Sequence, residues 1–507
     1  MVFSSAAFLF LFMPIALAGY FLCTTIKAKN EWLLAASLLF YAWGEPVYVV
    51  LMIVSIALNW SVALAIDHRQ TPGQRRALLA CLVAADVAII GFFKYQGFLA
   101  HTVNAIAGAP IMADLQLPLP IGISFYTLQA LSYAVDVYRG KVRAQHDIVV
   151  LGMYIACFPQ LIAGPIIRYA DISEQIANRR ASMDGFADGM RLFIVGLAKK
   201  VLLANVVAML ATDMLSRGGP AVGAVGAWAG LLAYTFQIYF DFGGYSDMAI
   251  GLGRMLGFTY KRNFNYPYIS TSAREFWRRW HISLSGFFRD YVYIPLGGNR
   301  VSTPRWVVNM LVVWSITGLW HGAAWNFVLW GAYWGALLVG ERLLWGDIVD
   351  QLPRIIGHLY AIVAFLFGWS VFWIEDPVTL LGFWQAMVGG FGATGTSTMW
   401  ELGVWEYAPV FIVCCIASTP LVPWLRLRLL RWAVADDCPS EQPLWDMRKL
   451  ESDELCRLDI PAQCPPSRAR ALAIVGVVAD IALLALLAIS AAAVVWGSFN
   501  PFIYFRF

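Results

Sequence analysis

The sequence predicts an all-α membrane protein that crosses the bilayer many times. Hydrophobic residues make up 60% of its 507 residues and charged residues only 13%, whereas soluble domains carry roughly 45–50% apolar and 25% charged residues. Apolar stretches recur along the chain, and a membrane-spanning helix needs about 20 mostly apolar residues. We predict roughly 10–13 transmembrane helices, with further re-entrant or interfacial helices around a central funnel.

A series of apolar stretches forms the predicted cores of these spans. In chain order they are Phe8–Leu22, Val47–Ile66, Ala77–Phe93, Leu192–Leu210, Ala227–Tyr239, Val307–Leu319, Leu359–Trp373, Val410–Leu421 and Ala471–Trp496. Three shorter apolar runs are interrupted by Gly, Pro, Gln or Ser, which favours tilted or re-entrant helices. These runs are Trp32–Trp43, Ile121–Val135 and Val149–Ile167.

Basic residues gather in the loops between the spans. The net charge is only +4, so it indicates orientation in a membrane and no nucleic-acid partner. By the positive-inside rule, the basic loops around residues 27–29, 69–76, 139–143, 254–305 and 426–431 face the cytoplasm. The turns Trp43–Pro46 and Trp373–Pro377 then lie outside. This pattern predicts a multi-pass membrane protein with its basic loops in the cytoplasm.

The cysteines show no metal-binding pattern. Cys438, Cys456 and Cys464 lie in one polar stretch that contains neither a histidine nor metal-ligand spacing. We predict that residues 433–470 form a cytoplasmic loop with free thiols, because disulfides are rare in a reducing compartment. No metal site is predicted.

Residues 254–305 are predicted to form interfacial helices and the floor of a polar funnel. This segment is too polar to span a bilayer and too aromatic for a solvated loop. Aromatic rings at headgroup depth, with arginines reaching toward water, fit amphipathic helices near the interface. On this interpretation, residues 1–507 make a single membrane-embedded domain.

Two histidines lie in settings that favour a reactive centre. His321 stands in an apolar stretch between Trp320 and Trp325, and an ionisable group at membrane depth is costly and usually functional. His281 ends an arginine-rich and aromatic run, Glu275-Phe-Trp-Arg-Arg-Trp-His281. The alternative is that each is a core imidazole bonded to a carbonyl group.

Several motifs along the chain carry a family resemblance. They are Met1–Ser5, Pro118–Tyr126, Phe158–Pro165, Tyr239–Gly253, Glu275–Asn299, Gly318–Gly322 and Asn500–Phe505. On these motifs the chain resembles the membrane-bound O-acyltransferases, and among them the bacterial alginate O-acetyltransferase branch. The resemblance runs from end to end and is loosest between residues 340 and 495. One departure is Gln160, where a histidine is expected in Phe-Pro-x-Leu-Ile-Ala-Gly-Pro.

The resemblance implies a multi-pass enzyme of the bacterial inner membrane, in which a cytoplasmic and a periplasmic funnel meet near a buried histidine. The family's two catalytic histidines map onto His321 and His281. The donor is a cytoplasmic thioester, either acetyl-CoA or an acyl carrier protein, and no bound cofactor is implied. In the alginate branch, a periplasmic acetyltransferase partner places the acetyl group on exopolysaccharide hydroxyls. Membrane lipids are the remaining expected partners.

Acyl transfer to a hydroxyl group needs a base for the hydroxyl proton and stabilisation of the tetrahedral oxyanion. A neutral imidazole at His321 can act as that base, or it can accept the acyl group itself in a ping-pong scheme. The sequence does not separate these two schemes. The alternative functions are D-alanylation of teichoic acid, acetylation of peptidoglycan or cellulose, and transport of a lipid-linked sugar.

The candidate substrate-binding residues are Arg278, Arg279, Trp280, Asp290, Trp320, Asn263 and Asn299. The two arginines either bind phosphates of coenzyme A or pantetheine, or anchor the interface. Asp290 either orients His281 or pairs with Arg289. The asparagines either line the funnel or cap backbone groups. Asp241 and Asp247 are expected to bond nearby arginines, with a proton path as the alternative.

Overall fold

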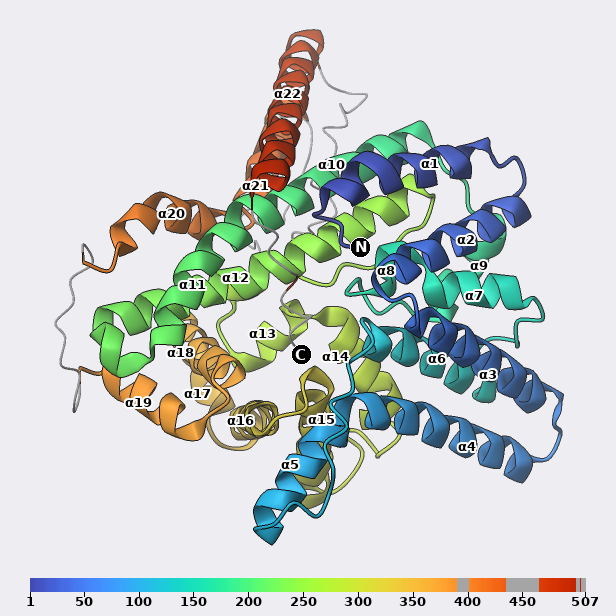
Figure 1. The fold of residues 1–507 in the computed structure, drawn as a ribbon. Helices are drawn as coiled ribbons and strands as arrows, with labels where there is room; N and C mark the ends of the chain where they lie inside the picture. The colour runs from blue at the N-terminus through green and yellow to red at the C-terminus, as the bar shows by residue number, and fades with distance from the viewer. Residues whose placement is uncertain (390–400, 435–464, 498–501, 503–507) are drawn as a thin grey trace.

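The computed structural model describes residues 1–389, 401–434, 465–497 and 502, and the regular secondary structure of these residues is helical (Figure 1). The predicted all-α polytopic class is therefore confirmed. Six described segments are long and apolar enough to cross a membrane: Tyr48–His68, Pro72–Ala107, Met183–Arg217, Ala221–Met255, Arg354–Trp373 and Pro466–Trp496. A bent pair, Val404–Ala417 and Leu421–Ala433, makes up to seven. Of the other predicted spans, Ile121–Val135 and Val149–Ile167 form shorter helices, whereas Val307–Leu319 lies in a 19-residue helix that is not among the six.

The N-terminal part of the chain packs around a buried helix, α6. Its helices are η1 (Phe8–Phe12), α1 (Met13–Leu22), α2 (Ile26–Gly44), α3 (Tyr48–His68), α4 (Pro72–Ile90), η2 (Gly91–Tyr95), α5 (Gln96–Ala107), α6 (Ile123–Tyr138), α7 (Ile148–Ala156), α8 (Phe158–Leu161) and α9 (Tyr169–Asn178). Gly122 begins α6 with a φ of 75°, a conformation that favours glycine. A Cβ atom at Gly122 would also lie 3.1 Å from the Leu161 carbonyl oxygen. This close approach brings the start of α6 against α8.

Two long helical segments run side by side through the centre (Figure 1). One consists of α10 (Met183–Ala198), η3 (Lys199–Ala204) and α11 (Asn205–Arg217), and the other is α12 (Gly219–Met255). Their backbones nearly touch, because a Cβ atom at Gly196 would lie 2.6 Å from the Gly244 carbonyl oxygen. Small residues at helix crossings allow this kind of packing in membranes.

Two ion pairs join η3 to α12. Lys200 Nζ lies 2.7 Å from Asp241 Oδ1, and both side chains are buried. Lys199 Nζ lies 2.7 Å from Asp247 Oδ2. Each carboxylate thus pairs with a lysine of η3, a partner that the sequence expectation did not include. The π-helical turn η3 presents both lysines to the neighbouring helix.

The remaining helices follow α12 in the chain. They are η4 (Pro267–Ile269), α13 (Ala273–Arg279), α14 (Ile282–Phe288), η5 (Arg289–Tyr293), α15 (Thr303–His321), α16 (Trp325–Gly340), η6 (Glu341–Trp345), α17 (Gly346–Gln351), α18 (Arg354–Trp373), α19 (Pro377–Met387), η7 (Val404–Tyr407), α20 (Ala408–Ala417), α21 (Leu421–Val434) and α22 (Pro466–Trp496). Residues 254–305 thus form a run of short helices, η4 to η5, joined by irregular backbone.

The polar stretch predicted as a loop over 433–470 falls mainly outside the described residues, which omit 435–464. Residues 466–470 are helical, because they form the first turns of α22. Cys438, Cys456 and Cys464 lie outside the described residues. Among the described cysteines, the free thiols are Cys23, Cys81, Cys157, Cys414 and Cys415.

Candidate active site

His321 is the last residue of α15, and only 3% of it is exposed. Its ring is in edge contact with Trp320 and Trp330, each at a centroid distance of 4.9 Å. Phe372 of α18 contacts the ring at 5.4 Å. The predicted flanking residue Trp325 is instead 54% exposed. His321 is therefore surrounded by aromatic rings as expected, but apart from Trp320 these rings come from helices α16 and α18.

His321 borders a small cavity of about 60 Å³. The other lining residues are Lys94, Leu119, Pro120, Ile121, Gly122, Ile123, Ser124, Phe125, Ile162 and Trp320. A second cavity of about 400 Å³ shares Ile121 and Ile162 as walls and reaches Glu45. Glu45 belongs to a turn that the charge pattern places outside the membrane. The His321 cavity thus adjoins the predicted outer side.

His281 is the residue before α14, and it is fully buried in a left-handed conformation with a φ of 44°. Its Nδ1 lies 3.1 Å from Asn263 Oδ1. The same oxygen accepts hydrogen bonds from the Ser283 backbone N–H (3.1 Å) and hydroxyl group (2.8 Å). A backbone N–H can only donate, so this Asn263 atom is an acceptor and His281 Nδ1 is a donor. Neutral His281 then keeps a lone pair at Nε2, which has no hydrogen-bond partner among the described residues.

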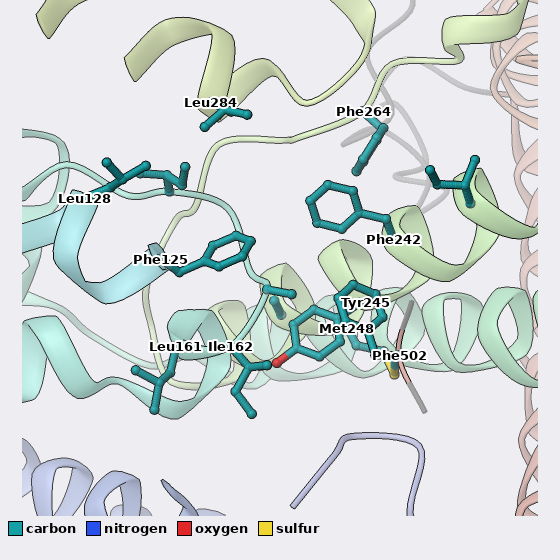
Figure 2. Close-up of a cluster of buried hydrophobic side chains, with 14 of the residues drawn as sticks. Phe125, Leu128, Leu161, Ile162, Phe242, Tyr245, Met248, Phe264, Leu284 and Phe502 are labelled. Carbon is teal, nitrogen blue, oxygen red and sulfur yellow. The ribbon is translucent and has the colours of Figure 1, made fainter. Parts of the chain in front are cut away.

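Trp320 contacts both histidines. The His281 and Trp320 ring centroids lie 5.8 Å apart, and Phe125 packs on Trp320 at 5.2 Å. On its other side His281 meets Phe242 of α12 at 4.7 Å. Figure 2 shows Phe125 and Phe242 among the apolar side chains that gather around the same space. The two histidines therefore lie along one apolar wall, with Trp320 between them in the contact network.

A larger cavity of about 490 Å³ opens among the short helices that follow α12. Its charged lining residues are mainly positive: Arg168, Lys261, Arg262, Arg278 and Arg289 against one carboxylate, Asp171, which pairs with Lys261. Ile282 and Ser283, which directly follow His281, also line it. This basic cavity belongs to the segment that the charge pattern places on the cytoplasmic side, so it offers a site for an anionic group.

The two neighbouring arginines of α13 have different environments. Arg278 is exposed and lines the basic cavity, and it has no ion-pair partner among the described residues. Arg279 is buried: its Nε and Nη2 donate to Glu275 Oε1 at 3.0 and 2.9 Å, and its Nη1 donates to the Asn265 carbonyl at 3.0 Å. Arg278 thus fits the ligand-binding interpretation, whereas Arg279 holds the fold together.

Two other sequence candidates do not line the histidine cavity. Trp280 is buried against Phe264 and Trp369. Asn299 is exposed and accepts hydrogen bonds from Tyr293 Oη (2.5 Å) and Arg342 Nη1 (2.6 Å). These contacts make both residues structural in the described conformation.

Asp290 pairs with Arg168 and Arg289 rather than with His281. Burial opposes its charged form, but hydrogen bonds and attraction from the Arg289 and Arg168 guanidiniums outweigh this and hold the pKa of Asp290 below its usual value. Of the two interpretations of Asp290, the structure favours pairing. Asn263, by contrast, both caps the start of α14 and orients His281.

Sequence reasoning missed Lys94 and Tyr95, which reach the end of α15 from the turn η2. The available signal was a lone lysine directly after the apolar stretch Ala77–Phe93. The unexpected Gln160 is fully buried, and its Nε2 donates to Gln129 Oε1 (3.1 Å) and to the Tyr154 carbonyl (2.6 Å). The departure at this motif position therefore fills a packed polar network.

Comparison with known proteins shows which family the chain belongs to. Residues 142–374 match the sequence profile of the membrane-bound O-acyltransferase family. The probable alginate O-acetylase AlgI of Azotobacter vinelandii is 37% identical over 519 aligned positions, which cover the whole of both chains. The corresponding protein of Pseudomonas aeruginosa is 43% identical over 76% of this chain and 75% of its own length.

The chain belongs to the membrane-bound O-acyltransferase family and is a multi-pass membrane acyltransferase. Within the family it lies in the alginate O-acetyltransferase branch. A peptidoglycan O-acetyltransferase of Helicobacter pylori is also similar, with 34% identity over 77% of this chain and 80% of its own. The resemblance drawn from the motifs is thus confirmed.

Proposed function

We propose that this protein takes an acetyl group from a cytoplasmic thioester and delivers it across the inner membrane for O-acetylation of an exopolysaccharide, with alginate as the polymer. The observation that carries the proposal is the placement of His321, buried among aromatic rings and bordering the cavity that adjoins the predicted outer side. Whole-length similarity to probable alginate O-acetylases supports the choice of polymer.

In this proposal His321 is the catalytic base or the acyl acceptor. As a base, it removes the proton of an acceptor hydroxyl while that oxygen attacks the thioester carbonyl carbon; the C–S bond then breaks and the thiol leaves with a proton. As an acyl acceptor, its ring nitrogen attacks the same carbon, the C–S bond breaks and the thiol leaves with the imidazole proton. The acceptor hydroxyl then attacks the acetyl carbonyl, the N–C bond breaks, and the hydroxyl proton passes to the released imidazole. His281, with its lone pair directed away from Asn263, supplies a second proton acceptor beside Trp320.

The basic cavity is the proposed donor site. Acetyl-CoA and a carrier-bound pantetheine both carry phosphates, and arginine binds phosphate oxygens through charge-assisted hydrogen bonds. Arg278 is the best-placed candidate because it is exposed in the cavity and Arg279 is not. Ser283 connects this cavity to the hydrogen-bonded group of Asn263 and His281. We propose no bound cofactor.

The acceptor side is proposed to receive a periplasmic acetyltransferase partner. The cavity around Glu45 and Tyr41 lies beside the His321 cavity and shares Ile121 and Ile162 with it. A hydroxyl group presented from the outer side would enter by this route. An acetyl ester is uncharged, so its transfer across the site leaves no ion in the apolar interior.

The test uses protein purified in nanodiscs with radiolabelled acetyl-CoA. We expect His321→Ala to lower thioester turnover by about 10³-fold, the size of a lost general base or nucleophile. His281→Ala should also lower turnover. The matched control is His101→Ala, because 76% of the His101 side chain is exposed. Label that stays on the wild-type protein would identify the ping-pong scheme. Full turnover in folded His321→Ala would refute the catalytic assignment.

Peptidoglycan is the second candidate acceptor, since the similar Helicobacter pylori protein is named a peptidoglycan O-acetyltransferase. The choice can be made in a strain that lacks its own alginate O-acetylase. Expression of this chain should restore acetyl esters on secreted alginate, and His321→Ala should not. Acetyl esters that appear on peptidoglycan alone would assign the other polymer.

A further inference from the structure

The C-terminal end of α15 carries carbonyl groups that its own helix cannot satisfy. The last four carbonyls of an α-helix have no intrahelical N–H partner. In α15 the backbone turns extended at Gly322, whose N–H returns to the Gly318 carbonyl. The carbonyls of Leu319, Trp320 and His321 therefore need partners from elsewhere.

Two adjacent residues of η2 supply these partners. Lys94 Nζ donates to the Trp320 carbonyl at 2.5 Å and lies 3.3 Å from the His321 carbonyl. Tyr95 Oη donates to the Leu319 carbonyl at 2.6 Å. Three consecutive carbonyls at the end of α15 are thus bound by side chains more than 200 residues earlier in the sequence, and the last belongs to His321.

The charge of Lys94 suits this position. The C-terminus of a helix carries a partial negative charge, which a cation stabilises. The residues that line the cavity with Lys94 include neither Asp nor Glu, so a carboxylate in the cavity does not explain the lysine. A lysine in apolar surroundings is costly and marks a functional position. Here the helix end beside His321 is what the ammonium group binds.

We propose that Lys94 is a positioning residue for His321. Its ammonium group fixes the last turn of α15, and so fixes where the His321 ring stands between Trp330 and the cavity. Tyr95 completes the same cap with a neutral hydrogen bond. This inference rests on the proposed catalytic role of His321. A displacement of about 1 Å from productive geometry can cost about 100-fold in rate.

The test measures kcat and KM for acetyl-CoA in nanodiscs. We expect Lys94→Met to lower kcat by about 100-fold with KM within about twofold of wild type, because geometry is lost and donor binding is not. Lys94→Arg keeps the charge and the donors and should recover about tenfold of that loss. Tyr95→Phe, which removes one neutral hydrogen bond, should lower kcat by about fivefold.

A second readout separates positioning from general loss of structure. The rate at which diethyl pyrocarbonate modifies His321, measured by mass spectrometry, should change in Lys94→Met, while the rate at exposed His101 stays the same. Wild-type kcat in Lys94→Met, or a raised KM with unchanged kcat, would overturn the inference. If Lys94→Met does not fold, Lys94→Gln is measured instead, and its kcat and KM are judged by the same criteria.

The two proposals fail in distinguishable ways. Activity that survives in His321→Ala would remove the proposed function itself. An inactive His321→Ala beside a fully active Lys94→Met would leave the proposed function standing and remove only the role of Lys94.

Discussion

The two buried histidines of the site are held in different ways. His281 is fixed through its ring, because Nδ1 donates a hydrogen bond to Asn263 Oδ1 and the Ser283 hydroxyl group donates to the same oxygen. His321 is packed among aromatic rings, and the end of its helix is bound by Lys94 and Tyr95. The first arrangement selects a tautomer, and the second selects a location. Substitutions that touch only one arrangement can therefore tell the two roles apart.

Asn263→Ala tests the arrangement at His281, and its effect is the largest after those of the His321 and Lys94 substitutions. The substitution removes the acceptor that fixes the His281 tautomer and leaves buried donors without a partner. If this cost of about 2 kcal/mol is carried into the transition state, it raises the activation free energy by the same amount. We expect kcat to fall by about 30-fold. Ser283→Ala is the control, since it removes one donor to Asn263 and leaves the contact with His281. Equal activity in Asn263→Ala and wild type would mean that the tautomer of His281 does not matter to turnover.

Substitutions of Arg278 and Arg279 test the proposed donor site. Arg278→Gln should raise KM for acetyl-CoA about tenfold, the effect of one lost charge-assisted hydrogen bond, with little change in kcat. Arg279→Gln breaks a buried pair with Glu275 and should instead lower the thermal midpoint. Steady-state kinetics and thermal unfolding are measured for both variants. A raised KM in Arg279→Gln alone would reverse the assignment.

The smallest expected effect belongs to Asp290, whose ion pairs lie beside the basic cavity. Its folded pKa is below the unfolded value, so its stabilising contribution is present above about pH 4 and is lost as the pH falls through the folded pKa. Asp290→Asn should therefore destabilise the protein by about 1 kcal/mol at pH 7. The difference from wild type should shrink below pH 4. Thermal unfolding at several pH values checks this, and a difference independent of pH would contradict it.

The sequence predicts the apolar helices and both histidines because these signals are local. Hydropathy identifies the spans, and the dense aromatic and arginine runs mark His281 and His321. It does not predict what surrounds them, since those contacts join distant parts of the chain. Lys94 reaches Trp320 across 226 positions, and Asn263 reaches Ser283 across 20.

The different environments of the two arginines of α13 were also not predictable from residue type alone. Arg278 and Arg279 are equivalent in composition, and only the burial of one helical face separates them. Glu275, one turn before Arg279, is the local feature that indicates which arginine is paired, because side chains four residues apart meet on a helix surface. The lysine partners of Asp241 and Asp247 depend instead on the packing of α12 against η3.

The ion pairs of Lys199 and Lys200 with Asp247 and Asp241 have a consequence for membrane insertion. A lysine near the centre of a lone helix costs roughly 2.5–3.5 kcal/mol to insert. The carboxylates that neutralise these two lysines arrive only with α12. We therefore expect the segment 183–255 to enter the membrane as one helical hairpin. Glycosylation mapping of chains that end after Arg217 would test this, and stable insertion of that truncated segment would contradict it.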